Sequence, residues 1–397
     1  MEDKKTWDLI SIASIPLVMT LGNSMLIPVL PAIEKELQIS SLQVSMLITV
    51  YSVVAIICIP FAGYLSDRLG RKVIIIPSLF LAGIGGLIAG FASWQMDDPY
   101  KYIIFGRFLQ GIGAAGSFPI VLPLVGDIFP KESDVSKGLG VVETSNTFGK
   151  VLSPILGAAL ATVVWFLPFF AFPVFCVISI IMMLFLVKTP KNTKKPVALK
   201  EFLHSIKTIF KNNGRWLYAI FIIGCICMFV IFGVLFYLST MLEDEHGIDG
   251  IKKGIILAIP LAALCLSSYI TGKGIGEEKP LMKWMTVIGL GLLTVSVFSI
   301  SFSKDIYILL TALVASGIGI GIALPSLDAL VTEGIKKEQR GTITSVYSSM
   351  RFVGVAVGPP VFAVLMKISH AVLFLSNTLI CVVALFIAVF AIKPDED

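Results

Sequence analysis

Hydrophobic residues are concentrated in twelve runs along the chain, each about 20 residues long, the length that an α-helix needs to cross a hydrocarbon layer of about 30 Å. The runs cover residues 8–31, 42–64, 73–94, 102–126, 138–164, 167–187, 216–241, 254–272, 284–302, 306–330, 341–366 and 371–392. A helix is the expected element because it satisfies its backbone hydrogen bonds internally in lipid. The pattern therefore predicts an all-α integral membrane protein with twelve transmembrane helices.

Composition excludes the main soluble classes. Charged residues make up 14% of the chain and hydrophobic residues 56%, with a mean hydropathy of +0.92, whereas charged residues make up roughly 25% of soluble domains. A water-soluble fold of this composition would expose far more apolar surface than soluble monomers do. A soluble enzyme, a nucleic-acid-binding protein and a disordered chain are therefore excluded, and an outer-membrane barrel with its alternating strands is disfavoured.

Candidate catalytic and metal-binding groups are not visible in the sequence. The 6 cysteines lie in apolar runs and fit small buried hydrophobes, and the 3 histidines show no zinc spacing. There is no nucleophile–histidine pair, and the glycines of GIGAA lie inside a run rather than in a phosphate loop. We therefore expect no enzyme activity, no cofactor, no metal and no nucleic-acid partner.

The distribution of lysine and arginine predicts the orientation. With twelve helices, both termini and every even-numbered loop share one side of the membrane, and that side carries 22 of these residues against 6 on the other. Cytoplasmic loops carry the excess of positive charge. We expect a multi-pass protein of the cell membrane with both termini in the cytoplasm.

The sequence divides into two similar halves. GIGAAGSFP at 111–119 matches GIGIGIALP at 317–325, at an offset of 206 residues. A basic stretch with an amphipathic segment separates the halves, so the predicted domains are an N-terminal six-helix bundle at 1–187, a cytoplasmic linker at 188–215 and a C-terminal six-helix bundle at 216–397. Matched halves are typical of transporters that rock two bundles around a central site. A duplicated channel would need a filter or constriction, and none is visible.

The turn between the second and third runs has the sequence GYLSDRLGRK. Its glycines allow close helix packing and a tight turn, and its charges can pair with the other half, closing one face and releasing it. The alternative is an ordinary basic cytoplasmic loop. The predicted cytoplasmic gate consists of Gly63, Asp67, Arg68, Gly70, Arg71 and Lys72.

This turn fits the loop signature G-x-L-x-D-R-x-G-R-K, and the chain therefore resembles the major facilitator superfamily. The PVLP at 28–31, the GRFLQGIGAA at 106–115 and the glycines of the fifth run are similar to motifs of the twelve-span drug:proton antiporter branch. The resemblance implies two pseudo-symmetric six-helix bundles. The residues that match the antiporter motif are Gly140, Gly149, Ser153, Pro154 and Gly157, with Ser153 and Ala158 standing where the family has glycine.

Two residues are candidates for proton coupling. Arg107 lies inside the fourth run, where its charge must be paired with another group or hydrated. The resemblance links this arginine to proton coupling. The alternative is an arginine that binds neighbouring carbonyl groups. Glu143 is the acid that lies well inside a run, where a carboxylate can take up and release a proton near neutral pH. Asp127 and Asp328, near the ends of their runs, are weaker candidates.

Two further cations are expected to line a substrate cavity. Lys150 lies near the midplane, two helical turns from Glu143, and Arg351 lies at a similar depth in the eleventh run. The resemblance implies that the fifth and eleventh helices face each other; the alternative is a structural ion pair made by Glu143. The predicted cavity residues are Lys150, Arg351, Asn23, Asn146, Gln110, Phe148, Phe232 and Tyr347.

The leading hypothesis is a monomeric, proton-coupled secondary active exporter of amphipathic small molecules, a multidrug-efflux antiporter of the kind that confers antibiotic resistance, working by alternating access. The two cavity cations suit an anionic or zwitterionic amphiphile better than a lipophilic cation. The alternative is therefore a flippase or exporter of an anionic lipid, a glycolipid or a siderophore-like metabolite. A membrane scaffold or sensor that no longer transports is a third hypothesis, which the gate sequence argues against.

Overall fold

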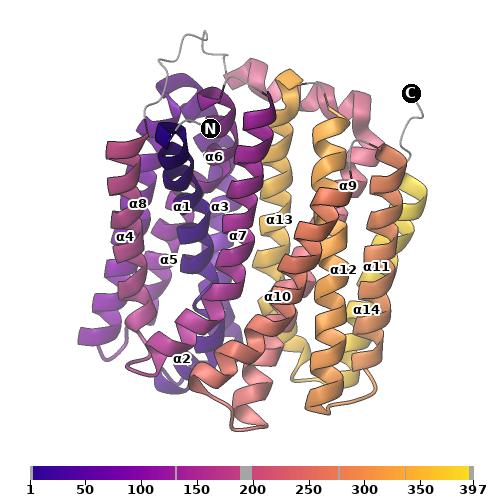
Figure 1. The fold of residues 1–397 in the computed structure, drawn as a ribbon. Helices are drawn as coiled ribbons and strands as arrows, with labels where there is room; N and C mark the ends of the chain where they lie inside the picture. Colours follow the sequence, from indigo (N-terminus) through magenta and orange to yellow (C-terminus); the bar gives the residue numbers. More distant parts are fainter. Residues whose placement is uncertain (1–2, 130–131, 188–198, 276–277, 336, 393–397) are drawn as a thin grey trace. The chain divides into compact units, whose positions relative to one another are not determined.

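The computed structural model describes residues 3–129, 132–187, 199–275, 278–335 and 337–392, and every regular element in these ranges is a helix (Figure 1). The helices are α1 (Asp3–Ser24), η1 (Ile27–Val29), α2 (Leu30–Glu36), α3 (Ser41–Leu69), α4 (Arg71–Gln95), α5 (Tyr100–Ala115), α6 (Phe118–Ile128), α7 (Glu132–Ala161), α8 (Leu167–Leu186), α9 (Leu199–Asp244), α10 (Gly250–Gly274), α11 (Lys279–Ile300), α12 (Ile306–Glu333), α13 (Lys337–Leu365) and α14 (His370–Ala391).

The predicted membrane fold is confirmed. Within the described residues, 11 helical segments are long and apolar enough to cross a membrane. Each corresponds to one predicted run. The remaining run, the fifth, corresponds to α7, which has 30 residues but carries charged side chains such as Glu143 and Lys150 within its length. This polar helix carries the predicted coupling residue Glu143 and four of the site's other predicted members, Asn146, Phe148, Lys150 and the antiporter-motif glycine Gly149.

Two runs that were expected to be single helices are interrupted. The first run is divided into α1, η1 and α2 by Pro28 and Pro31, because proline has no backbone N–H to donate and disfavours the helical conformation in the residue before it. The fourth run is divided into α5 and α6 at Gly116, just before Pro119. A Cβ at Gly116 would lie 2.0 Å from Ser78 Oγ, so the chain passes α4 too closely there for a larger residue.

The amphipathic segment that was expected to form a separate helix in the linker is continuous with the seventh run. Both are parts of α9, which extends over 46 residues. Residues 188–198 of the predicted linker lie outside the described residues. The position of this segment at a membrane surface and the three-part domain division stay predictions.

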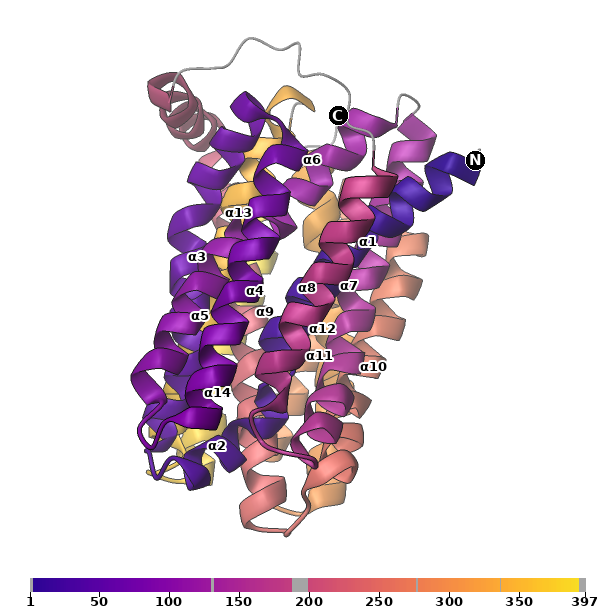
Figure 2. The same ribbon diagram turned by 90° about the vertical axis from the view of Figure 1, so that its left-hand side faces the viewer.

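The chain forms two compact units. Unit 1 contains residues 1–202 and 239–255, and unit 2 contains residues 203–238 and 256–397. In unit 1, α1 packs on α7 and α8, and α4 packs on α5 and α8 (Figures 1 and 2). In unit 2, α11 packs on α12 and α14. The end of α9 and the start of α10, although they belong to the second half of the sequence, thus form part of unit 1.

The sequence repeat has the same packing role in each unit. A Cβ at Gly111 would lie 2.5 Å from the Tyr51 carbonyl oxygen of α3. Gly317 is the corresponding residue of the second repeat, and a Cβ there would lie 2.4 Å from the Pro260 carbonyl oxygen of α10. Two residues further on, the next glycine of each repeat approaches α4 or α11 in the same way. The repeated glycines therefore let one helix of each unit approach the backbones of two neighbours, as small residues do in membrane helices.

Substitution of Gly354 by alanine should destabilise the protein. The new Cβ would lie 2.0 Å from the Cys225 carbonyl oxygen and 2.7 Å from the Phe229 amide nitrogen. Because backbone atoms cannot move aside cheaply, we expect a loss of about 1–3 kcal/mol, seen as a lower unfolding temperature of the purified protein in detergent. Gly291→Ala is the matched control, since a Cβ at that position would have no neighbouring atom within 4 Å. Equal unfolding temperatures for the two variants would contradict the packing argument.

Candidate functional site

Arg107 is fully buried at the centre of unit 1, with 0% of its surface exposed. Its Nε donates to the Leu47 carbonyl oxygen at 2.7 Å, and one terminal nitrogen donates to Gln110 Oε1 at 2.6 Å and to the Gly22 carbonyl oxygen at 3.2 Å. The other terminal nitrogen donates to Asn23 Oδ1 at 2.6 Å. These acceptors come from α1, α3 and α5, so one guanidinium connects three helices.

The surroundings of Arg107 fit a positioning group. Each of these four acceptors is a neutral carbonyl or amide oxygen, and the guanidinium carbon lies 4.5 Å from the centre of the Tyr51 ring. A buried charge is costly unless it is fully hydrogen-bonded, and here the buried cation is held by dipoles and an aromatic face. Asn23 and Gln110, predicted as cavity residues, lie in this cluster with 5% and 1% of their surfaces exposed.

A polar seam, consisting of Thr20, Asn146 and Glu143, joins α1 to α7. The Thr20 hydroxyl donates to Asn146 Oδ1 at 2.7 Å, and Asn146 Nδ2 donates to Glu143 Oε1 at 3.2 Å. Glu143 is half-buried, whereas Asn146 is 6% exposed. The Glu143 carboxyl group is thus the acceptor at the end of the seam.

The antiporter-motif residues lie beside this seam. Gly149 faces Thr20, and a Cβ at Gly157 would lie 2.0 Å from the Met25 carbonyl oxygen. Ser153 is buried and its hydroxyl donates to the Gly149 carbonyl oxygen at 2.6 Å. The motif residues Gly149 and Gly157 therefore bring α7 close to the end of α1, while Gly140 has no atom within 4 Å of its Cβ position.

The other predicted cavity residues on α7 point in different directions. Lys150 is half-buried and lies seven residues from Glu143, on the same side of the helix. Phe148 is 53% exposed, and at 3.6 residues per turn it lies on a different side of α7 from both. The structure does not bring Phe148 together with Glu143 and Lys150.

In unit 2, Arg351 of α13 meets an acid that the sequence analysis ranked low. Its Nη1 lies 3.5 Å from Asp328 Oδ1 of α12, and its guanidinium carbon lies 5.7 Å from the centre of the Tyr347 ring. Tyr347 is 3% exposed and packs against Phe221 of α9. Phe232, further along α9, is buried at 7% exposure. The sequence analysis named all three residues, Asp328 as a weaker coupling candidate, but did not predict that Asp328 lies beside Arg351.

The gate sequence forms its contacts with α6 and α8 of unit 1. Arg71 pairs with Asp67 and also with Asp127 Oδ2 of α6 at 3.2 Å. The Lys72 ammonium donates to the carbonyl oxygens of Leu184 and Val187 at 3.1 and 2.8 Å, at the end of α8. The remaining predicted gate residues are Gly63, Arg68 and Gly70. Gly63 lies within α3 and the exposed Arg68 lies near the end of that helix, while Gly70 follows it with a φ of 103°, which favours glycine.

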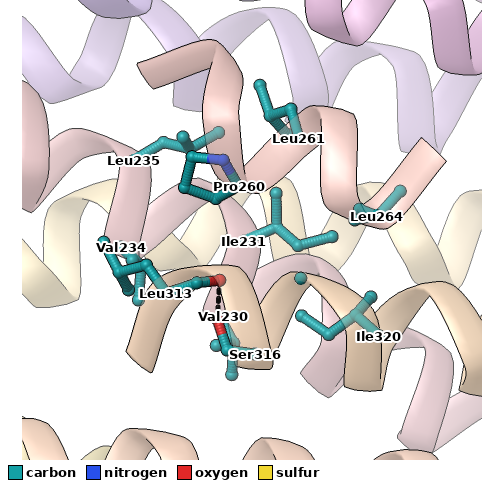
Figure 3. A pocket seen from close by; sticks show the side chains of 11 residues that line it. Val230, Ile231, Val234, Leu235, Pro260, Leu261, Leu264, Leu313, Ser316 and Ile320 are labelled. Carbon is teal, nitrogen blue, oxygen red and sulfur yellow. Dashed lines mark hydrogen bonds between the residues drawn. The ribbon is translucent and has the colours of Figure 1, made fainter. Parts of the chain in front are cut away.

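A cavity of about 30 Å³ lies within unit 2, between α9, α10 and α12 (Figure 3). Its walls are aliphatic, and the Ser316 hydroxyl is used in a hydrogen bond to the Leu313 carbonyl oxygen at 2.8 Å. An aliphatic lining with one hydroxyl, already hydrogen-bonded, offers no charged group to a substrate. Within the described ranges, no cluster of three or more His, Cys, Asp or Glu residues could hold a metal ion.

Comparison with known proteins gives the family. The model of the Major Facilitator Superfamily matches residues 12–282 and 282–397, which together span most of the chain. The chain belongs to the major facilitator superfamily.

Similar proteins support this assignment. The chain is 56% identical over 394 residues to the bacillibactin exporter of Bacillus subtilis (strain 168), covering 98% of both chains. It is 25% identical over 393 residues to Multidrug resistance protein 2 of the same organism, covering 97% of this chain and 95% of that one. The fold is similar to that of the human organic anion transporter MFSD10 (TETRAN), with a TM-score of 0.77, 16% identity, and coverage of 98% of this chain and 100% of that one.

These findings confirm the predicted superfamily and fold, and the antiporter-branch resemblance is consistent with them. Some residues of this major facilitator protein were missed by sequence reasoning because their partners are distant in sequence. Asp127, the partner of Arg71, lies 56 residues from it in the sequence, and Thr20, the partner of Asn146, lies 126 residues from it. A polar residue inside an apolar run was the available signal for Thr20.

Replacing Asn23 by leucine should destabilise the protein, because it removes an acceptor from the buried guanidinium of Arg107. A hydrogen bond to a charged group contributes about 1.5–3 kcal/mol, and a loss of that size should appear as a lower unfolding temperature. Asn377→Leu is the matched control. Asn377 is 2% exposed in α14 and its amide has no hydrogen-bond partner among the described residues, so that change should leave stability unchanged or raise it. The same loss in both variants would exclude the proposed role of the Arg107 cluster.

Proposed function

We propose that this protein is a secondary active exporter of bacillibactin or a closely related siderophore-like metabolite. The observation that carries the proposal is 56% identity over 98% of both chains with the bacillibactin exporter of Bacillus subtilis. Identity to Multidrug resistance protein 2 is 25%, so the multidrug hypothesis has weaker support. The metabolite alternative from the sequence analysis is therefore preferred to the leading hypothesis.

The charges of the two units favour the same choice. Lys150 of α7 and Arg351 of α13 are half-buried cations, and Arg351 also lies 3.5 Å from the Asp328 carboxylate. A guanidinium or ammonium binds oxygen anions through charge-assisted hydrogen bonds. A substrate with acidic oxygens would gain from both groups, whereas a lipophilic cation would be repelled. We assign substrate recognition to Lys150 and Arg351, with the aromatic Tyr347 and Phe232 supplying apolar contact.

We assign proton coupling to Glu143. Its carboxylate is the terminal acceptor of the seam that begins at Thr20 on α1. Protonation would remove the negative charge and convert one acceptor oxygen into a donor, which weakens the bond from Asn146 and with it the link between α1 and α7. Arg107, whose donors are occupied by neutral oxygens, then holds the surrounding helices in position.

The proposed cycle is alternating access in the cell membrane, with both termini in the cytoplasm because the positive charges gather on that side. The proposed cytoplasmic gate remains Gly63, Asp67, Arg68, Gly70, Arg71 and Lys72, of which Asp67, Arg71 and Lys72 make the contacts within unit 1 described above. We propose that the monomer is the working unit.

Substrate choice can be tested in proteoliposomes that contain the purified protein under an imposed pH gradient. We expect transport of bacillibactin and little transport of a lipophilic fluorescent cation. Lys150→Met should raise the KM for bacillibactin by about tenfold or more, since losing a hydrogen bond to a charged group costs about 1.5–3 kcal/mol.

Lys252→Met is the control for the substrate experiment, because Lys252 is exposed at the start of α10 and should leave the KM unchanged. Transport of the cationic dye without transport of bacillibactin would overturn the proposed substrate class.

Proton coupling can be tested with Glu143→Gln, which keeps the size of the side chain and removes its charge. We expect this variant to lose accumulation driven by the pH gradient and to keep substrate binding, measured by tryptophan fluorescence or equilibrium dialysis. Asp98→Asn, an exposed acid in the α4–α5 loop, should accumulate substrate normally. Gradient-driven accumulation at the normal rate in Glu143→Gln would remove Glu143 from the coupling mechanism.

A further inference from the structure

The ion pair between α12 and α13 of unit 2 is a long one. Arg351 Nη1 lies 3.5 Å from Asp328 Oδ1, whereas a strong charge-assisted hydrogen bond measures about 2.7–2.9 Å. The ion pairs that Glu243 makes in unit 1 are shorter, with Lys253 Nζ at 2.6 Å from its Oε2 and Lys35 Nζ at 2.9 Å from its Oε1. The Asp328 carboxylate therefore contacts Arg351 without binding it closely.

The pair is also partly exposed. The side chains of Arg351 and Asp328 are 18% and 38% exposed, whereas Arg107 of unit 1 is fully buried and donates four hydrogen bonds. Charged side chains within membrane helices face a bundle interior or a water-filled cavity rather than lipid. Partly exposed ion pairs in contact with water contribute little free energy. A ligand can therefore reach Arg351, and the pair can separate at small cost.

A buried aromatic ring supports the guanidinium independently of Asp328. The guanidinium carbon of Arg351 lies 5.7 Å from the centre of the Tyr347 ring, a distance at which a cation is attracted to an aromatic face. Tyr347 is 3% exposed and its ring lies 5.5 Å from that of Phe221 on α9. A Cβ at Gly224 would lie 2.7 Å from Tyr347 Cε2, so the ring is closely packed on α9. Tyr347 can thus keep Arg351 in place when the carboxylate moves away.

The internal repeat allows the surroundings of Arg351 to be compared with unit 1. Gly149 of α7 approaches Thr20 of α1, and Gly354 of α13 approaches Cys225 of α9. Each member of the second pair follows its counterpart in the first by 205 residues. The contact between α9 and α13 in unit 2 therefore corresponds to the contact between α1 and α7 in unit 1.

The two units differ at the positions of the ion pair. Asn146 corresponds to Arg351 at the 205-residue offset, and Leu122 corresponds to Asp328 at the 206-residue offset of the glycine motifs. Unit 1 thus has neutral side chains at both positions. Because the repeated packing does not need a charge at either position, the ion pair is a feature of unit 2 alone, and binding explains it better than packing does.

We propose that Asp328 is the exchange partner of the substrate at Arg351: its carboxylate pairs with the guanidinium when no substrate is bound, gives way to an acidic oxygen of the substrate, and returns as the substrate leaves. The role of Asp328 rests on the proposed recognition of the substrate by Arg351. Two anions that compete for one guanidinium repel each other, so Asp328 lowers the affinity for the substrate and speeds its release. Asp328 is a positioning residue, since it acts through Arg351.

The exchange can be tested by measuring the binding and release of bacillibactin by the purified protein in nanodiscs. Asp328→Asn removes the competing charge, so we expect the Kd to fall by about fivefold, the factor that corresponds to about 1 kcal/mol. Most of this change should appear as slower release in a chase experiment. Turnover in proteoliposomes at saturating substrate should fall as well, although the substrate binds more tightly. A purely structural role for Asp328 would not produce tighter binding with slower turnover.

Two further variants serve as controls for Asp328→Asn. Asp328→Glu keeps the carboxylate and should bring the rate of release back toward that of the parent. Glu278→Gln also removes one negative charge from unit 2, but Glu278 is exposed at the start of α11, and the Kd should stay unchanged. If Asp328→Asn is not recovered as a monodisperse protein, Asp328→Leu replaces it, because leucine stands at the corresponding position of unit 1.

Arg351 variants separate this role from the proposed function. Arg351→Gln should raise the Kd for bacillibactin by about tenfold or more, and an unchanged Kd would overturn substrate recognition by Arg351 itself. If Arg351→Gln weakens binding but Asp328→Asn changes neither the Kd nor the rate of release, the exchange role of Asp328 alone is overturned. Asp328→Asn combined with Arg351→Gln should bind like Arg351→Gln, because the two residues act as one unit. Tighter binding by the double variant than by Arg351→Gln would contradict an action through Arg351.

Discussion

Close approach of helix backbones is the constraint on which both units depend. In lipid the helices gain little from burying apolar side chains against one another, so packing at small residues and polar contacts must hold them together. Gly85 and Gly106 in unit 1, and Gly289 and Gly319 in unit 2, are reciprocal pairs in which a Cβ on either glycine would lie 2.4–2.5 Å from the carbonyl oxygen of the other. Each unit therefore contains a close glycine–glycine contact between neighbouring helices, α4 with α5 in unit 1 and α11 with α12 in unit 2, although the glycines of the two pairs do not correspond at the 206-residue offset of the repeat.

Polar groups within this framework fall into two kinds. Arg107 donates four hydrogen bonds to neutral oxygens and lies over the Tyr51 ring, so its position is fixed by contacts with three helices. Glu143 is half-buried and accepts a hydrogen bond from the Asn146 amide, and we propose it as the group that responds to protons. In that proposal the Arg107 cluster keeps the helices around Glu143 in position.

Much of the fold could be predicted from the sequence, since the length and apolar character of the runs set the helices and the offset of the glycine motifs revealed the two halves.

The residues of the candidate site could be named from the sequence more easily than their contacts could be predicted. Arg107, Asn23 and Gln110 were predicted as functional residues, but their meeting in one cluster depends on the depth at which α1, α3 and α5 cross. Pro28 and Pro31 were read as a family motif rather than as a helix break. Phe148 was chosen for its type, although helical spacing places it away from Glu143. Lys253 was counted as a loop cation because it lies at the edge of an apolar run, and its burial follows from packing between distant segments.

The ion pairs that Glu243 makes with Lys253 and Lys35 also have a consequence for the order in which the protein is assembled. Glu243 and Lys253 are separated by 10 residues, so their pair can form as soon as the α9–α10 hairpin has been synthesised, and the lysine can enter the membrane region already neutralised. Lys35 and Glu243 are separated by 208 residues, and the contact between them closes a very long loop, which is a late event in folding. The Glu243 carboxylate therefore takes part in both an early local contact and a late long-range contact. The long-range contact with Lys35 forms only when the first and second halves of the chain have packed together.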